Sequence, residues 1–122
     1  MMRRRKTKTN SEIREWYKNE LSLISKSNEK WIAEGLTAEV RARRAWRMRN
    51  DARSKARSWM SSAEVGLLEL RDIFCYGNRR GPTFEYLVKQ GEKRGLNREQ
   101  IYEKIIESSS RTNPRIDGIF DI

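Results

Sequence analysis

Apolar residues recur at intervals of three and four along most of the chain, a spacing that places them on one face of an α-helix. The first run begins after Ser11 and ends near Gly35, a residue type that favours a helix C-terminus. Its apolar members are Ile13, Trp16, Tyr17, Leu21 and Ile24. The polar stretch 25–30 predicts a break or bend before Trp31 and Ile32.

A second helix is predicted after Thr37, a good N-cap residue, with Glu39 in the first turn where the helix dipole favours a carboxylate. Its apolar positions are mostly small: Ala38, Ala42, Ala45, Met48, Ala52, Ala56 and Trp59. Small side chains let another helix approach closely. Arg49, Arg53 and Arg57 recur at steps of four, which predicts an arginine stripe on the opposite side of this helix.

Three shorter helices are predicted in the second half of the chain, each introduced by capping residues. Residues 61–64 match a capping box and begin a helix that ends at Gly77. Thr83 caps the next helix, which ends near Gly95, and residues 97–100 cap the last one, which ends before Pro114. The pattern predicts an all-α fold: a single compact domain of about five helices with short connections over residues 11–122, after a basic disordered arm at 1–10.

Composition narrows the available chemistry. The 122 residues suit one domain, and no apolar run has the length of a membrane span. The basic start, residues 1–6, is not followed by an apolar stretch, so no signal peptide is predicted. Cys75 is the single cysteine, which rules out an internal disulfide, and the sequence has no histidine, the commonest general base and metal ligand.

Charge is distributed very unevenly. Residues 1–60 carry 17 Lys and Arg against 7 Asp and Glu, so the whole net charge of +10 lies in the first half. Such a density of like charge on a short segment repels itself unless anions bind it. Nucleic acid is the commonest polyanion in a cell, and the arginine-rich helix is therefore predicted to contact phosphates.

Two further polar clusters stand at predicted helix ends, where functional sites are common. Residues 76–78 with 81–84 read first as a turn between two helices, although Tyr76 and Asn78 could present polar groups to a ligand. Residues 108–113 combine hydroxyls, Arg111 and Asn113, and suit a helix cap and a phosphate site about equally. The carboxylates best able to act as a base or metal ligand nearby are Glu39, Asp51, Asp72 and Glu85. No spacing among them forms a recognised metal motif, so no cofactor is predicted and Mg²⁺ is left open.

Three strings of this sequence, at 43–57, 76–84 and 105–113, resemble a small helical domain at the C-terminal tips of bacterial polymorphic toxins, including Rhs-type proteins. The resemblance runs from about Trp31 to Asn113. It implies an antibacterial effector delivered into the cytoplasm of a neighbouring bacterium and neutralised in the producer by an acidic immunity protein. Domains of this kind often carry histidine near the positions of Trp46 and Asn50, whereas this chain has none.

Charge and resemblance together predict a toxin domain that binds nucleic acid and cleaves RNA or DNA. As a histidine-free nuclease it would use Asp72 or Tyr76 for proton transfer and Arg111 to stabilise the charge of the transition state. The predicted nucleic-acid-binding residues are Arg41, Arg44, Arg47, Arg49, Arg53, Arg57, Asn78 and Asn113. The alternatives are a non-enzymatic nucleic-acid-binding accessory protein, a module that docks an acidic protein, and a toxin with a protein or nucleotide target.

Overall fold

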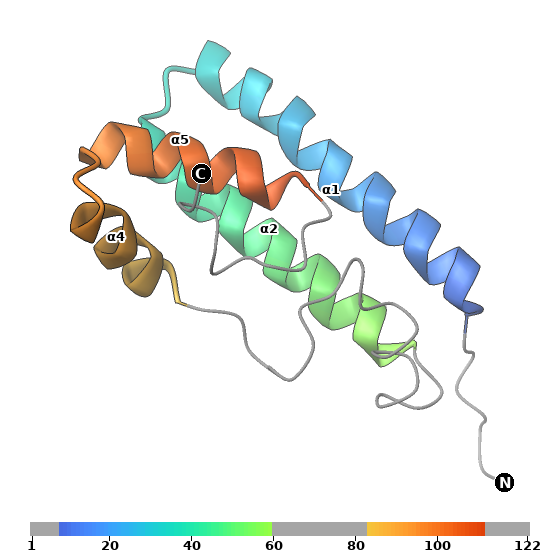
Figure 1. Ribbon diagram of the computed structural model, residues 1–122. Helices are drawn as coiled ribbons and strands as arrows, with labels where there is room; N and C mark the ends of the chain where they lie inside the picture. The colour runs from blue at the N-terminus through green and yellow to red at the C-terminus, as the bar shows by residue number, and fades with distance from the viewer. Residues whose placement is uncertain (1–7, 60–82, 112–122) are drawn as a thin grey trace, which may run out of the picture.

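A computed structural model of the protein describes residues 8–59 and 83–111. Four helices lie in these ranges: α1 (Asn10–Ala33), α2 (Ala38–Ser58), α4 (Phe84–Lys93) and α5 (Arg98–Ser109), with no strand among the described residues (Figure 1). The predicted all-α class is confirmed there. The helix predicted over 61–77, residues 1–7 of the arm predicted over 1–10, and the segment after residue 111 lie outside the described residues. None of the four helices is long and apolar enough to cross a membrane.

Helix α1 is continuous, so the predicted break at 25–30 is wrong. Thr9, rather than Ser11, is its N-cap, in a capping box with Glu12: the Thr9 hydroxyl accepts from the Glu12 N–H at 3.1 Å. The polar stretch does not interrupt the helix because its side chains face solvent or, at Asn28, accept a hydrogen bond from α2. The helix ends as predicted at Gly35, whose φ of 81° is the left-handed conformation that glycine adopts without strain.

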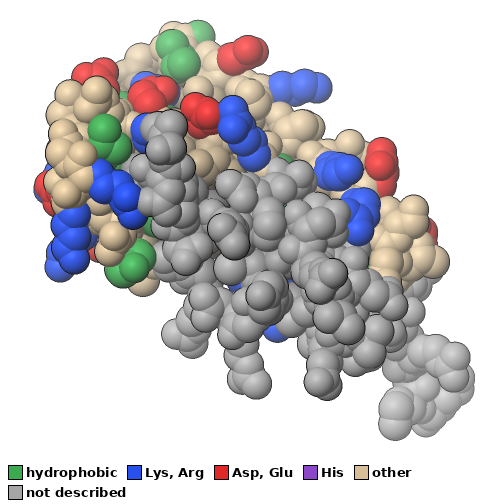
Figure 2. Space-filling model, viewed as in Figure 1, with side chains coloured by type: hydrophobic (Ala, Val, Ile, Leu, Met, Phe, Trp, Pro, Cys, Tyr) green, Lys and Arg blue, Asp and Glu red, His purple; other side chains and the backbone are tan. Residues whose placement is uncertain are grey.

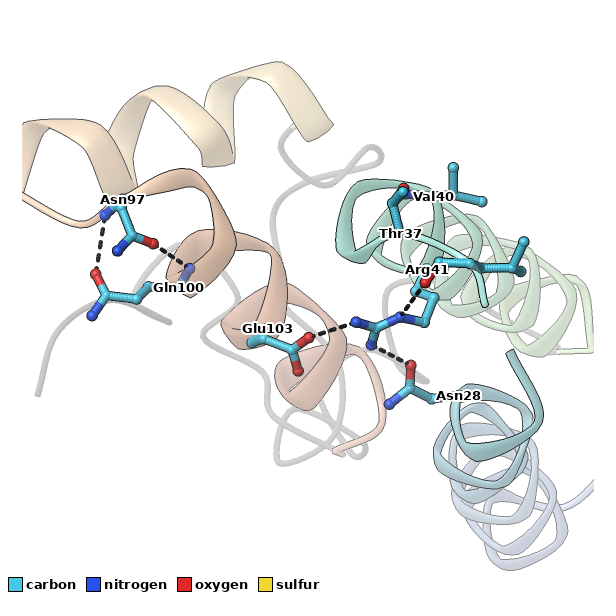
Figure 3. Close-up of polar contacts among 8 residues, drawn as sticks. Asn28, Thr37, Val40, Arg41, Asn97, Gln100 and Glu103 are labelled. Carbon is cyan, nitrogen blue, oxygen red and sulfur yellow. Dashed lines mark hydrogen bonds and ion pairs between the residues drawn. The ribbon is translucent and has the colours of Figure 1, made fainter. Parts of the chain in front are cut away.

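The remaining caps are those that the sequence predicts. Thr37, Thr83 and Asn97 each accept a hydrogen bond from the backbone N–H three residues later, at 3.3, 3.1 and 2.8 Å. Gln100 returns a side-chain acceptor to the Asn97 N–H at 3.0 Å, which completes a capping box on α5 (Figure 3). These local contacts fix the starts of α2, α4 and α5 and hence the lengths of the turns before them.

Helix α2 is the centre of the described fold. It packs against α1 on one side and α5 on another, and α4 packs on α5 (Figure 1). The core side chains of α2 include Ala42, Ala45, Ala52 and Ala56, as the alanine pattern predicts. The α1 side of the core is formed by Ile13, Tyr17, Leu21 and Ile24, and the α4–α5 side by Phe84, Leu87, Val88, Ile101, Tyr102, Ile105 and Ile106.

Helices α4 and α5 approach each other closely at Gly91. A Cβ at this position would lie 2.5 Å from Cγ1 of Ile101, a side chain with no exposed surface. Nearby, the rings of Phe84 and Tyr102 stack with centroids 6.0 Å apart. The glycine is therefore needed for the close approach of the two helices, and this contact places the start of α4 against α2.

Candidate nucleic-acid interface

The arginines of α2 fall into two groups that the sequence did not distinguish. Arg41, Arg49 and Arg53 are buried, Arg57 is half-buried, and Arg44 and Arg47 are exposed. The prediction that the stripe lies opposite the apolar face is therefore wrong for Arg49 and Arg53. The buried arc is wide because α2 packs against α1 and α5, and the small alanines leave room for the aliphatic stems of arginines beside them.

Arg41 ties three helices together. Its guanidinium donates to Asn28 Oδ1 of α1 at 3.0 Å, to Glu103 Oε1 of α5 at 2.9 Å and to the Leu36 carbonyl at 3.3 Å (Figure 3). The side chain is 10% exposed, whereas that of Glu103 is 50% exposed. Three of the five guanidinium N–H donors are thus used within the fold, and the side chain is buried, so Arg41 contributes to the packing of the helices.

Arg49 and Arg53 lie close enough to Tyr17 of α1 to affect its titration. Burial raises the pKa of the Tyr17 phenol above its ordinary value of 10.0, and the positive charges of Arg49 and Arg53 act in the opposite direction. The phenol therefore stays neutral at physiological pH. Arg49 is 1% exposed and Arg53 is 5% exposed, so in this conformation neither side chain can reach a phosphate in solvent.

The exposed face of α2 carries the cations that remain available. They are Arg43, Arg44, Arg47 and Lys55, against the exposed carboxylates Glu39 and Asp51. Arg43 is partly occupied, since it pairs with Glu39 at 3.2 Å and Glu85 at 3.5 Å and lies over the Phe84 ring. Arg47 makes no ion pair within the described residues.

A shallow pocket of about 360 Å³ lies between α2 and the start of α4. It is lined by Arg43, Trp46, Arg47, Asn50, Asp51 and Phe84. The two guanidiniums and the Asn50 amide can donate hydrogen bonds to an anionic oxygen, whereas Asp51 would repel it. The pocket therefore combines two guanidinium groups with one carboxylate. A phosphate would bind more favourably beside Arg43 and Arg47 than beside Asp51.

Where this exposed face borders α1, cations lie over tryptophan rings along the edge where α1 and α2 meet. Trp16 of α1 contacts Trp59, which follows α2, edge to face, with centroids 4.6 Å apart. The ammonium groups over these rings belong to Lys55, 5.8 Å from Trp16 and 5.7 Å from Trp59, and Lys8, 4.9 Å from Trp59. At the other end of the helix pair, the Arg44 guanidinium lies 5.7 Å from the Trp31 centroid. Cations are thus held on the outside of the molecule by ring faces rather than by carboxylates.

The hydroxyl cluster at the end of α5 has a structural role. Ser109 is buried and donates to the Ile105 carbonyl at 2.7 Å, and Ser110 donates to the Glu107 carbonyl at 2.8 Å. Arg111 is exposed and pairs with Glu107 at 2.7 Å. The hydroxyls of Ser109 and Ser110 therefore favour a role at the end of the helix over a phosphate site. The catalytic role of Arg111 stays a prediction.

Four predicted site residues lie outside the part of the chain that the structure describes: Asp72, Tyr76, Asn78 and Asn113. The catalytic roles of Asp72 and Tyr76 therefore stay predictions. Among residues 8–59 and 83–111, no three Asp, Glu, His or Cys side chains are grouped so that they could hold a metal ion. The involvement of Mg²⁺ stays open.

The view in Figure 2 adds the distribution of charge over one face of the molecule. Lys and Arg side chains of the described residues are distributed over the part of this face that is not grey, and Asp and Glu side chains lie among them. The described cations visible in this view therefore do not form one continuous patch. The cations defined by contacts lie on the exposed face of α2, at the pocket beside α4 and at the edge beside α1.

Sequence reasoning missed the contacts of cations with Trp16, Trp31 and Trp59 along the edge where α1 and α2 meet. The spacing of Lys55 and Trp59, four residues apart on one helix, was a readable signal for that contact. The approach of Trp16 to Trp59 was not readable, because it depends on how α1 and α2 pair along their lengths. Comparison with known proteins adds no relative: no family model, curated protein or solved structure matches this chain.

Proposed function

We propose that this domain binds nucleic acid through the exposed cations of α2, namely Arg43, Arg44, Arg47 and Lys55. The observation that supports the proposal is the character of the exposed α2 face, where these cations outnumber Glu39 and Asp51. Arg41, Arg49 and Arg53, which the sequence pattern placed among the phosphate contacts, are assigned to the packing of the domain because they are buried.

The contacts of the exposed cations support an anionic ligand. A cation over an aromatic ring keeps donors that can still bind a phosphate, whereas a cation in a closed ion pair must first exchange its partner. Arg44 and Lys55 are in the first situation. Arg47 lies on the same exposed face, between them in the sequence.

The toxin hypothesis adds an activity to this binding. If the resemblance to polymorphic toxin domains holds, the domain acts on RNA or DNA in the cytoplasm of a target bacterium and is neutralised by an acidic immunity protein. Cleavage would then depend on residues such as Asp72, Tyr76 and Arg111, with Mg²⁺ as a candidate helper ion. Binding and cleavage are separable, so each has its own assay.

Binding is tested by titrating labelled RNA and DNA with the protein at several salt concentrations. The variant Arg44→Ala with Arg47→Ala should bind more weakly and lower the slope of log K against log salt by about two, roughly one per lost phosphate contact. The matched control is Lys18→Ala with Lys26→Ala, which removes the same charge from the outer face of α1. Equal loss of binding in both variants would mean that only net charge matters, and the assignment to α2 would then be wrong.

Cleavage is tested by incubating the protein with total bacterial RNA and supercoiled plasmid, with and without magnesium. Breakdown that is lost in Asp72→Asn, Tyr76→Phe or Arg111→Ala would support the nuclease. Retarded but intact nucleic acid would support the non-enzymatic binding protein. A complete lack of binding, together with stoichiometric capture of an acidic protein, would contradict the proposal and support the docking module.

A further inference from the structure

The edge where α1 and α2 meet carries three half-buried tryptophans, and a cation lies over each ring. Trp46, the fourth tryptophan of the chain, is 5% exposed and belongs to the core. The other three, which we call the tryptophan edge, are Trp16, Trp31 and Trp59. The core ring of Trp46 also has a cation near it, Arg49 at 5.5 Å from its centroid, but that cation is buried. Arg44 and Lys55 are exposed on partly exposed rings, so a ligand in solvent can reach both the cation and the ring.

The tryptophan edge has a definite length. Arg44 lies over Trp31 near the start of α2, and Lys55 lies over Trp16 and Trp59 near its end. Eleven residues of helix separate the two cations, which corresponds to about 16 Å at the usual rise. Two cationic aromatic platforms are thus held at a fixed separation by one rigid helix.

A pocket of about 190 Å³ opens beside the second platform. Its walls include Trp16, Met48 and Ala52, and its polar lining is Glu20, Asp51 and Lys55. An apolar wall with an aromatic ring suits a flat, partly apolar group. The two carboxylates accept hydrogen bonds and repel phosphate, so they suit the amino groups of a nucleobase better than the backbone.

We propose that the tryptophan edge binds single-stranded nucleic acid, with unpaired bases stacked on its rings and with Arg44 and Lys55 on the phosphates. This inference rests on the proposed function and specifies its ligand. Binding of a single strand without sequence preference combines cations that follow the backbone with aromatic rings on which bases stack. The tryptophan edge has a cation and an aromatic ring at each of its two ends: Arg44 with Trp31, and Lys55 with Trp16 and Trp59.

The same geometry disfavours a duplex as the ligand. Bases in a duplex are stacked on each other and present only their edges and the backbone, so a half-buried ring on a helix has no base face to contact. A single strand can turn its bases towards the rings. Each cation that leaves a ring face when a base arrives gains a phosphate in its place, so no charge is left without a partner.

The test compares a short oligocytidylate, whose bases carry an amino group, with the same strand annealed to its complement. We expect the single strand to bind more tightly and to quench tryptophan fluorescence. Trp31→Leu should weaken single-strand binding about ten-fold, because stacking on one aromatic side chain is a substantial part of such affinity. Trp31→Phe should restore most of it, since phenylalanine retains a ring face. The salt slope should be unchanged in Trp31→Leu and reduced in Arg44→Ala.

The outcomes separate this inference from the proposed function. Equal affinity of Trp31→Leu, Trp31→Phe and the unaltered protein, or a preference for the duplex, would overturn the stacking proposal while nucleic-acid binding stands. If neither the single strand nor the duplex binds, both the stacking proposal and the proposed nucleic-acid binding are overturned. Because Trp31 lies near the end of α1, we expect the leucine variant to fold, and its circular dichroism checks this. Lys55→Ala, which leaves every ring in place, provides a second variant that should weaken binding to the single strand.

Discussion

At the residue scale, the buried arginines show how a phosphate-binding pattern and a structural pattern can coincide in one sequence. Arg41, Arg49 and Arg53 share the helix with Arg44 and Arg47, yet only the last two reach solvent. A guanidinium has five donors in a fixed plane, which suits a phosphate and equally suits several acceptors on neighbouring helices. The three acceptors of Arg41 illustrate the second use.

Arg41→Ala should lower the free energy of unfolding by about 2 kcal/mol, because it removes three hydrogen bonds and leaves three partly buried acceptors without their donor. Glu103→Gln should cost less than about 1 kcal/mol, since the carboxylate is half-exposed and its ion pair is screened by water. Urea unfolding of the two variants measures the difference.

The affinity of Arg41→Ala for nucleic acid tests whether the residue also contacts phosphates. Under conditions where Arg41→Ala is folded, its affinity for nucleic acid should equal that of the unaltered protein. A clear loss of affinity without a loss of stability would contradict the structural role of Arg41 and return it to the phosphate contacts that the sequence pattern predicted.

At the element scale, the helix starts are set by local chemistry and the helix contacts by close approach. Thr37, Thr83 and Asn97 could be identified as caps from the sequence, because the hydrogen bond of an N-cap spans only three residues. The role of Gly91 could not, since glycine within a helix is locally unfavourable and its benefit arises only from Ile101 on another helix.

Gly91→Ala should therefore destabilise the protein by about 1–3 kcal/mol, the usual cost of overpacking, despite the better helix propensity of alanine. Ile101 has no exposed surface and little space in which to move away from the new methyl group. Ile101→Ala alone should also destabilise, by loss of packing, whereas the double variant should be more stable than the sum of the two effects predicts. Thermal unfolding of the four proteins gives the coupling, and additive effects would refute the contact.

The candidate site shows the same limit of sequence reasoning. The excess of arginine in α2 was readable as a count, but which arginines face solvent depends on the width of the buried arc. Helix spacing alone placed Arg49 opposite the alanines, because it treats the apolar face as narrow. Two packing partners of α2 widen this arc enough to include Arg41, Arg49 and Arg53. The tryptophan edge depends likewise on the pairing of α1 with α2, about which local spacing carries no information.

At the scale of the whole molecule, the net charge of +10 must be reconciled with a small domain. Ion pairs on the described surface, such as Arg43 with Glu39 and Arg98 with Glu92, offset part of the repulsion. On the exposed face of α2 the cations remain in excess, and Lys55 and Arg44 rest on rings instead of carboxylates. The domain therefore keeps its repulsion concentrated where an anion is proposed to bind.

This concentration predicts how stability responds to salt. Raising ionic strength from very low to physiological values should raise the midpoint of thermal unfolding, because screening weakens the repulsion between exposed cations. The effect should be smaller in Arg44→Ala with Arg47→Ala than in Lys18→Ala with Lys26→Ala, although both variants lose the same charge. Circular dichroism melts at several salt concentrations measure it.

Two results would contradict this view of the charge. Equal salt responses in the two double variants would show that repulsion is spread over the molecule rather than concentrated on α2. A midpoint that falls as salt is added would show that ion pairs such as Arg41 with Glu103 outweigh the repulsion. If the expected difference is found, an anion that binds α2 stabilises the fold in two ways. It reduces the repulsion between the exposed cations of that face, and its binding to the folded state shifts the unfolding equilibrium by mass action.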